Sequence, residues 1–293
     1  MKLAVLPAYN EETAIGSVIL KTKKYVDKVV VIDDGSSDDT VEIAKLAGAE
    51  VYCHEKNKGY GAAIQSSFIV AKNNDADVMV IIDSDGQHNP DEIPKLIDPI
   101  CNAGYDFVIG SRFLKSTTSI PLYRKLGIQF LTKFTNMGLK QEVTDSQSGF
   151  RAYSKKAIFD LQGNITGMGI GSELVIRAQE LGLKIKEIPI TCKYDDVEGS
   201  THNPVFHGAS VFYSILTIIR DKQPLLFFGI PGIVFLVFGI YWGWQIVDIY
   251  YSTGVFGLGK CLLALLCIII AIVAIFCALI LDSINRIIKK NQY

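Results

Sequence analysis

The sequence predicts an α/β domain with a mainly parallel sheet and helices on both faces, followed by two membrane-spanning helices. Short continuous apolar runs recur within residues 1–204, and segments with helical spacing separate them. Continuous apolar strands are typical of parallel sheets that are covered on both faces. The whole chain has 29 basic and 30 acidic residues, but residues 224–293 contain only six of them. The chain therefore has a water-soluble part and a part suited to lipid.

The composition excludes several classes of protein. Apolar residues make up 49% of the 293 residues, and the formal net charge is -1. A near-neutral chain has no basic surface to attract nucleic acid, so we expect no nucleic-acid partner. The six cysteines show no C-x-x-C spacing, which argues against structural zinc and for a reducing compartment. The N-terminus lacks a secretory signal, so we expect residues 1–204 to form a cytoplasmic domain.

Four apolar runs predict the strands of the sheet. They lie at residues 3–6, 29–32, 78–82 and 107–109. Apolar residues at helical spacing within 15–19 and 62–71 predict helices between them. The carboxyl ends of parallel strands meet at one edge of the sheet, and ligands of such folds bind there. The candidate site therefore consists of the residues that follow the runs, at 7–11, 33–36, 83–87 and 110–112.

Acidic residues follow three of these four runs. Carboxylates gathered at one edge repel one another unless a cation joins them. Asp83, Asp85 and Gln87 offer hard oxygen ligands from one turn, which suits Mg²⁺ or Mn²⁺ shared with substrate phosphates. An Asp-x-Asp string also closes turns without any metal, and the string alone leaves that alternative open.

Two uncharged apolar runs, 224–247 and 261–281, are each long enough to cross the roughly 30 Å hydrocarbon core of a bilayer as a helix. Basic residues flank the pair, with Arg220 and Lys222 before it and a basic tail at 282–293 after it. The positive-inside rule then places both ends in the cytoplasm, with two spans in the cell membrane. The alternative is a buried helical hairpin in a soluble core.

Residues 205–223 carry apolar side chains at helical spacing and end in basic residues. This pattern predicts an amphipathic helix along the membrane interface, although a helix docked on the preceding domain fits it equally well. Within the first span, Gly239 and Gly243 form a small-x-x-x-small pair. Such pairs allow close helix packing and favour a homo-oligomer.

Five motifs, taken in order, resemble one enzyme family. They are Pro7–Glu12, Val31–Ser36, Asn57–Gly61, Asp83–His88 and Gly110–Phe113. Together they resemble the inverting nucleotide-sugar glycosyltransferases of family 2, which have the GT-A fold. Asp145–Arg151 and the two C-terminal spans are similar to the dolichyl- or polyprenyl-phosphate sugar synthases. Within that group the chain most resembles the archaeal enzymes that load the first sugar onto dolichyl phosphate for N-glycosylation.

The resemblance implies a membrane-bound hexosyltransferase. It would transfer sugar from UDP-glucose, UDP-N-acetylglucosamine or GDP-mannose to dolichyl or polyprenyl phosphate, with Mg²⁺ or Mn²⁺. The chain departs from the mannose enzymes at Ser200, because Thr201 follows where lysine is common, and this leaves the donor open. Transfer to a saccharide acceptor in cell-surface polysaccharide synthesis and non-catalytic binding of a lipid-linked sugar are the alternative functions.

The resemblance also assigns roles to single residues. Nucleotide-sugar binding falls to Pro7, Tyr9, Glu11, Asp34, Lys58, Gly59, Asp83 and Ser84. Asp34 would accept a hydrogen bond from the base, whereas Asp38 or Asp39 would only cap the next helix. The metal ligands would be Asp83, Asp85 and Gln87, and Asp85 would also act in catalysis.

Three arginines, Arg112, Arg124 and Arg151, would hold the acceptor phosphate, since guanidinium groups bind phosphate oxygens in a bidentate geometry. Arg112 would also be catalytic, while Arg124 fits equally well as a solvated helix residue. Asp145, the third catalytic candidate, stands where related inverting enzymes keep a general base. A phosphate acceptor is already ionised at neutral pH. The alternatives are therefore that Asp145 orients the acceptor or Arg151, or pairs with Arg151 for structure alone.

Overall fold

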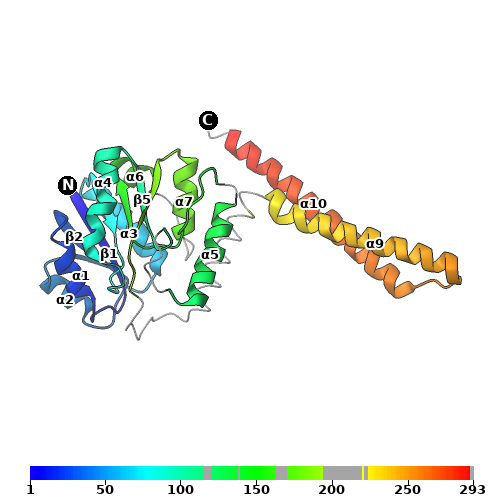
Figure 1. Cartoon of the computed structure of the whole chain (residues 1–293), viewed down its shortest axis with the longest axis horizontal. Helices are drawn as coiled ribbons and strands as arrows, with labels where there is room; N and C mark the ends of the chain where they lie inside the picture. Colours follow the sequence, from blue (N-terminus) through cyan, green and yellow to red (C-terminus); the bar gives the residue numbers. More distant parts are fainter. Residues whose placement is uncertain (115–119, 138, 163–169, 194–219, 221–223, 291–293) are drawn as a thin grey trace. The chain divides into compact units, whose positions relative to one another are not determined.

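The computed structural model describes residues 1–114, 120–137, 139–162, 170–193, 220 and 224–290 (Figure 1). The chain divides into two compact units, residues 1–215 and 216–293. Apart from Arg220, the predicted interface helix at 205–223 lies outside the described residues, as do Ser200 and Thr201. These features stay predictions.

A seven-stranded sheet forms the centre of the first unit, with the strand order β3-β2-β1-β4-β6-β5-β7. The strands are β1 (Lys2–Ala8), β2 (Lys28–Asp33), β3 (Glu50–Cys53), β4 (Val78–Ile81), β5 (Phe107–Ser111), β6 (Arg151–Ser154) and β7 (Ile185–Pro189). All neighbours are parallel except those of β6, which runs antiparallel to both β4 and β5. The predicted, mainly parallel sheet is confirmed.

Helices cover both faces of the sheet. They are α1 (Ile15–Thr22), α2 (Thr40–Leu46), α3 (Tyr60–Asn73), α4 (Ile93–Ala103), α5 (Leu122–Asn136), α6 (Lys155–Asp160) and α7 (Ile170–Glu180), with a 3₁₀ turn at Pro90–Glu92. Alternate residues of β1 point to opposite faces, so Leu3 packs in the core with α3, α6 and α7, whereas Ala4 packs in the core with α1, α2 and α4. The two cores explain why the strands are apolar throughout.

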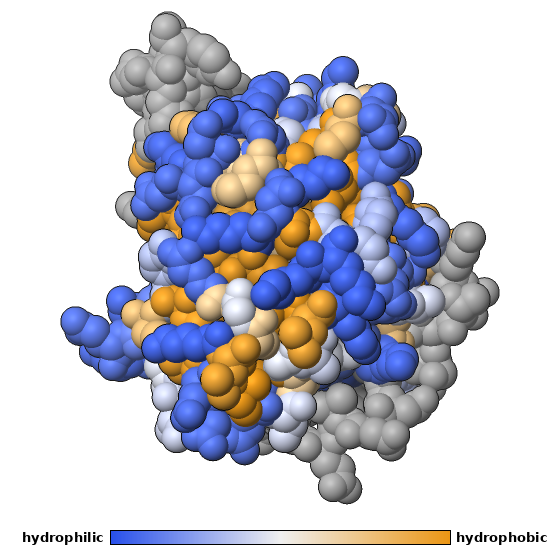
Figure 2. Space-filling model, turned by 90° about the vertical axis from the view of Figure 1, so that its left-hand side faces the viewer, coloured by the Kyte–Doolittle hydropathy of each residue, from blue (hydrophilic) through white to orange (hydrophobic). Residues whose placement is uncertain are grey.

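The outer surface of this unit is mixed in character. Figure 2 shows the face on the side of α1 and α2, where polar side chains surround smaller apolar patches. Leu20 of α1 and Leu46 of α2 are among the exposed apolar residues. Single apolar side chains of this kind are normal on a soluble surface.

The reversed strand β6 brings a third loop to the carboxyl edge of the sheet. Its first residue, Arg151, pairs with Ile81 near the end of β4 and with Ile109 of β5. An antiparallel strand begins at the edge where its parallel neighbours end. The 145–151 loop, which precedes β6, therefore reaches the edge where Asp83 follows β4.

The second unit contains two long apolar helices. A π-helical turn (Leu225–Gly229) leads into α9 (Ile230–Thr253), and α10 spans Leu258–Lys290. Both helices are long and apolar enough to cross a membrane, as the sequence predicted. They continue beyond the predicted limits at residues 247 and 281 because the flanking residues extend the helical hydrogen bonding.

The two long helices pack closely through small residues. The residues of α9 that this packing buries are Gly232, Gly239 and Ile246, and those of α10 are Ala264, Ala271 and Ala278. A β-carbon on Gly239 would lie 2.7 Å from Ile268, whereas one on Gly243 would meet nothing within 4 Å. Gly239 therefore serves the hairpin itself, and a homo-oligomer stays a prediction.

Candidate active site

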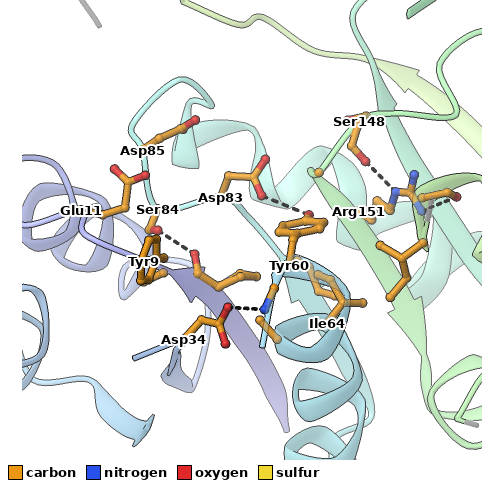
Figure 3. A pocket seen from close by; sticks show the side chains of 18 of the residues that line it. Tyr9, Glu11, Asp34, Tyr60, Ile64, Asp83, Ser84, Asp85, Ser148 and Arg151 are labelled. Carbon is orange, nitrogen blue, oxygen red and sulfur yellow. Dashed lines mark hydrogen bonds between the residues drawn. The ribbon is translucent and has the colours of Figure 1, made fainter. Parts of the chain in front are cut away.

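A cavity of about 330 Å³ lies at the carboxyl edge of the sheet (Figure 3). The ends of β1, β2 and β4, the 145–151 loop and the starts of α3 and α7 contribute to its wall. The predicted site residues on this wall are Pro7, Tyr9, Glu11, Asp34, Gly59, Asp83, Ser84, Asp85 and Arg151. The fold thus gathers strand-end residues that lie far apart in the sequence.

Asp34, at the end of β2, is buried and held by the segment that follows β3. Its carboxylate accepts hydrogen bonds from the backbone N–H groups of Lys58 (2.9 Å) and Gly59 (2.7 Å). It also lies 2.7 Å from Nδ1 of His54. Lys58 therefore reaches this site through its backbone, while the residue itself is exposed.

The capping role near the start of α2 falls to Asp38. Its carboxylate accepts a hydrogen bond from the backbone N–H of Thr40 at 3.1 Å. Asp39, directly before the helix, makes no capping bond through its side chain. The structure therefore separates Asp34, which faces the cavity, from the acidic residue that organises the next helix.

Three carboxylates, Glu11, Asp83 and Asp85, lie close together on the cavity wall (Figure 3). Burial, followed by the charges of Asp85 and Asp83, raises the pKa of Glu11 to about 7. Burial and the charge of Asp83 also raise the pKa of Asp85. Both groups resist ionisation because they are buried and because nearby carboxylates repel their negative charge, and a cation would relieve this repulsion.

Protein side chains supply only part of a metal site at this edge. Within the described residues, no three His, Cys, Asp or Glu side chains converge closely enough to hold a metal ion. Gln87 donates its backbone N–H to Asp85, while its side-chain oxygen lies 3.9 Å from the thiol of Cys192. The amide oxygen of Gln87 therefore faces Cys192, and its role as a metal ligand stays a prediction.

Asp83 is fixed from several sides. The hydroxyl of Tyr60, at the start of α3, donates a hydrogen bond to its Oδ1 at 3.2 Å, and Nε2 of His88 lies 3.6 Å from its Oδ2. Burial would raise the pKa of Asp83, but His88, Tyr60 and Arg112 outweigh it and lower the pKa. Asp83 therefore stays ionised, whereas the neighbouring Glu11 and Asp85 take up a proton more readily.

Arg112 and Asp145 form a bidentate ion pair. The Nε and Nη2 groups of Arg112 donate to Oδ2 and Oδ1 of Asp145 at 2.7 and 2.8 Å. The backbone N–H of Arg112 adds a third bond, at 3.2 Å. Asp145 has no exposed surface. Both of its oxygens are thus engaged by the arginine that follows β5.

The alternative in which Asp145 pairs with Arg151 is wrong. The guanidinium group of Arg151 donates instead to the backbone carbonyl groups of Ser146, Ser148 and Gly171. Arg151 is buried at the start of β6, where it ties the 145–151 loop to the start of α7. This arrangement gives Arg151 a structural role, and its contact with an acceptor phosphate stays a prediction.

Glu187 of β7 holds the start of the loop that precedes β6 through hydrogen bonds to its backbone. Its carboxylate accepts hydrogen bonds from the backbone N–H groups of Thr144 (2.8 Å) and Asp145 (3.0 Å). Burial raises the pKa of Glu187, although the bonds from the loop oppose the rise. The ion pair of Asp145 therefore rests on a loop that is itself held by the neighbouring strand.

Arg124 of α5 lies close enough to the acidic edge to affect its charge. Burial and Asp83 raise the pKa of Asp85, whereas His88 and Arg124 oppose that rise. The positive charge of Arg124 is thus felt at the cavity. Arg124 is not among the residues that line the cavity, and its contact with an acceptor phosphate stays a prediction.

Comparison with known proteins agrees with this geometry. The model of the family described as "Glycosyl transferase family 2" matches residues 4–161, which is more than half of the chain and contains Asp34, Asp83, Asp85 and Asp145. The chain belongs to glycosyl transferase family 2. The resemblance stated from the motifs is therefore confirmed, and the protein is a glycosyltransferase.

Two curated relatives of this glycosyltransferase each match about three quarters of the chain. A UDP-N-acetylglucosamine–dolichyl-phosphate N-acetylglucosaminyltransferase of Methanococcus voltae is 35% identical over 241 residues, which covers 74% of this chain and 96% of the relative. A dolichyl-phosphate hexose transferase of Haloferax volcanii is 32% identical over 222 residues, which covers 75% of this chain and 94% of the relative.

A solved structure confirms the GT-A fold of this glycosyltransferase. It is the glucosyl-3-phosphoglycerate synthase of Mycobacterium tuberculosis in complex with Mn²⁺ and UDP-glucose. The TM-score is 0.58 at 25% sequence identity, and the match covers 75% of this chain and 78% of that one.

Three side chains of the glycosyltransferase site escaped the sequence analysis: His54, Tyr60 and Glu187. Tyr60 lies inside the Gly59–Gly61 motif, so its aromatic hydroxyl between two glycines was an available signal. His54 and Glu187 carry no signal of this kind. His54 reaches the site because β3 pairs with β2, and Glu187 because β7 pairs with β5, which is distant in sequence.

Proposed function

We propose that this glycosyltransferase transfers a sugar from a nucleotide sugar to dolichyl or polyprenyl phosphate, with inversion, at the surface of a membrane. The observation that carries the proposal is the acidic edge of the cavity, where Glu11, Asp83 and Asp85 gather. The charge of Arg112 lies close enough to lower the pKa of Asp83, and that of Arg124 lies close enough to oppose the rise in the pKa of Asp85. Asp83 and Asp85 suit a nucleoside diphosphate with its cation, and Arg112 and Arg124 suit a second, anionic substrate. The name of the Methanococcus voltae relative includes both substrates, and that of the Haloferax volcanii relative includes dolichyl phosphate.

Asp34 would recognise the donor base. Its carboxylate faces the cavity beside Pro7 and Tyr9, and it accepts hydrogen bonds from neighbouring backbone N–H groups. Ser84 holds the end of β4 to the end of β1 through a 2.6 Å hydrogen bond to the carbonyl group of Pro7. The walls that would enclose the nucleotide are therefore fixed before it binds.

Asp85, with Asp83, Glu11 and Gln87 nearby, would hold a divalent cation together with diphosphate oxygens. The raised pKa values of Glu11 and Asp85 fit this assignment, since burial and then the charges of neighbouring carboxylates raise both. The Mn²⁺ in the related UDP-glucose complex supports a divalent ion without separating Mg²⁺ from Mn²⁺. A bound cation would offset the charge of the leaving diphosphate.

The acceptor would need orientation more than deprotonation. A phosphate monoester has its second pKa near 6, so one of its oxygens is already a nucleophile at neutral pH. Asp145 has both oxygens bonded to Arg112, which favours a positioning role over that of a general base. Arg112 and Arg124 would then hold the phosphate for attack on the anomeric carbon, opposite the leaving diphosphate.

The outer face of α5 supports access from a membrane. Leu126 and Phe130 are 58% and 49% exposed, with Lys125 and Lys133 on the same helix. The helix contains no acidic residue. An apolar face bordered by lysines is typical of helices at a bilayer with anionic lipids. We place α5 there, with the site and both chain ends on the cytoplasmic side, as the basic flanks of the spans indicate.

Transfer of labelled sugar tests the proposal. Membranes containing the full chain would receive UDP-glucose, UDP-N-acetylglucosamine or GDP-mannose, with dolichyl or undecaprenyl phosphate and either Mn²⁺, Mg²⁺ or EDTA. We expect one donor to label lipid phosphate in a metal-dependent way, and Asp85→Asn to abolish it. Asp98→Asn, an exposed acidic residue of α4, is the matched control and should remain active.

The outcome also separates the alternatives. Labelling of a saccharide but of neither lipid would indicate a cell-surface polysaccharide enzyme. Nucleotide binding without any transfer, by a chain shown to be folded, would indicate a binding protein.

A further inference from the structure

Three hydrogen-bonded side chains, of which Asp34 is buried and His54 and Ser66 are half-buried, lie beside the cavity near Asp34. His54, just after β3, places Nδ1 2.7 Å from Oδ1 of Asp34 and Nε2 2.8 Å from the hydroxyl of Ser66 in α3. The side chains of His54 and Asp34 are 11% and 5% exposed. These hydrogen bonds thus link the segments after β2 and β3 to α3, the helix that carries Tyr60.

The bonds around Asp34 make its carboxylate an acceptor only. Two backbone N–H groups, those of Lys58 and Gly59, already donate to its two oxygens. With both oxygens accepting, Nδ1 of His54 is the side that carries the hydrogen in their contact. The hydroxyl of Ser66 can then donate to Nε2 of a neutral imidazole or accept from a charged one, and Nδ1–H is kept in either state.

We propose that His54 is a positioning residue that sets base specificity by holding the Asp34 carboxylate as a fixed hydrogen-bond acceptor. The inference rests on the proposed function, in which Asp34 meets the base of the donor nucleotide. Oδ1 of Asp34 is occupied by two donors and Oδ2 by one. The remaining acceptor position of Oδ2 can bind only a group that carries hydrogen.

This geometry selects between matched pairs of bases. Uracil and guanine carry a ring N–H, whereas cytosine and adenine present a bare ring nitrogen at the equivalent position. If a bare nitrogen faces the fixed carboxylate, two hydrogen-bond acceptors oppose each other without a hydrogen between them. This arrangement costs binding free energy, so the site should reject cytosine and adenine. The glycosyltransferase should therefore prefer UDP to CDP and GDP to ADP, and His54 should be needed for that preference.

Binding of the four nucleoside diphosphates to the detergent-solubilised full chain, with Mn²⁺ present, tests the inference by titration calorimetry. We expect His54→Ala to weaken binding of the preferred nucleotide about tenfold and to change binding of its matched partner little. The ratio of the two dissociation constants should therefore move closer to one. His54→Gln keeps a side-chain N–H and should recover part of the preference. Glu55→Gln, an exposed neighbour on the same segment, is the control.

Kinetics give a second readout that a merely structural role would not produce. The donor KM should rise in His54→Ala while kcat at saturating donor stays within about twofold of the parent enzyme. If His54→Ala fails to fold, the same measurements are made on Ser66→Ala, because this variant removes the hydrogen bond between Ser66 and Nε2 of His54. An unchanged preference in the folded variant, or equal weakening of both members of a pair, overturns the role of His54. Failure of the parent chain to bind any nucleotide overturns the proposed function instead.

Discussion

The α-carbon of Gly149 lies against the carboxylate of Asp83. A β-carbon at position 149 would stand 2.6 Å from the carboxyl carbon of Asp83, far inside the distance that nonbonded carbon atoms keep. Only glycine therefore leaves Asp83 where it is. The contact joins the 145–151 loop to the end of β4, so the two sides of the cavity meet at these residues.

Gly149→Ala should displace Asp83 from Tyr60 and His88. A shift of about 1 Å in a positioned group can cost about 100-fold in rate, and we expect a loss of that order in kcat/KM for the donor. Initial rates at several Mn²⁺ concentrations measure it. Gly127→Ala on α5 is the matched control, because a β-carbon there meets nothing within 4 Å. Equal activity of the two variants would contradict the tight contact.

Variants of the Arg112–Asp145 pair should affect stability and activity differently. Replacing Asp145 with Ala leaves a largely buried guanidinium group without its partner, at a cost of about 3–5 kcal/mol in the free energy of unfolding. A double variant, Arg112→Met with Asp145→Leu, should regain much of that stability, because both charges are gone. It should remain inactive if Arg112 holds the acceptor. Denaturant unfolding and transfer assays together measure the two effects, and an active double variant would remove Arg112 from the mechanism.

Stability without metal should depend on pH through Glu11. Burial and the nearby Asp85 and Asp83 raise its pKa from 4.5 to about 7, so the folded chain keeps this proton at pH values where the unfolded chain has lost it. The contribution of Glu11 to the free energy of unfolding is therefore fully present below about pH 4.5. It declines as the pH rises and levels off above about pH 7.

Thermal unfolding in EDTA across this range measures that contribution, and Glu11→Gln should remove it. Cation binding favours the ionised form of Glu11, so affinity for Mn²⁺ should increase as the pH rises toward 7. Identical pH profiles of the parent chain and Glu11→Gln would show that Glu11 does not titrate in this range.

The exposed apolar face of α5 should matter only for acceptors in a bilayer. Replacing Phe130 with Glu adds a charge beside Leu126, and we expect about a tenfold loss of transfer to dolichyl phosphate in vesicles. Transfer to a short-chain, water-soluble polyprenyl phosphate should change little. Ile69→Glu, an exposed apolar residue of α3, is the control. Equal losses with both acceptors would indicate a folding defect instead of lost membrane contact.

Much of the sheet could be predicted because its central strands are buried on both faces. The runs at 3–6, 29–32, 78–82 and 107–109 correspond to β1, β2, β4 and β5. Strand β3 was missed because it lies at the sheet edge, where Glu50, Tyr52 and Cys53 are exposed. Strand β6 begins with a buried arginine, and β7 carries Lys186 and Glu187 between its two buried isoleucines, so neither forms a continuous apolar run.

The acidic residues of the candidate site could be predicted from the sequence, but the ion-pair partner of Asp145 could not. Asp34, Asp83 and Asp85 follow buried strands, and that position alone marks them. The partner of Asp145 depends on which strands become neighbours. Because β6 is inserted between β4 and β5, the chain reaches Arg112 from Asp145 across 33 residues of sequence. Sequence proximity instead favoured Arg151, which bonds to backbone carbonyl groups that no side-chain pattern reveals.

The strand order has a consequence for how such enzymes can be recombined. Strands β3, β2, β1 and β4 all come from the first part of the chain, and β6, β5 and β7 all come from the part after α4. The segments carrying Asp34 and Asp85 thus precede α4 in the sequence, and those carrying Arg112 and Arg124 follow it. A single crossover within α4 would exchange everything after it as one block while keeping the strand ends that carry Asp34, Asp83 and Asp85. The incoming block would have to supply a glycine that faces Asp83, together with the 145–151 loop and the start of α7 that complete the cavity wall.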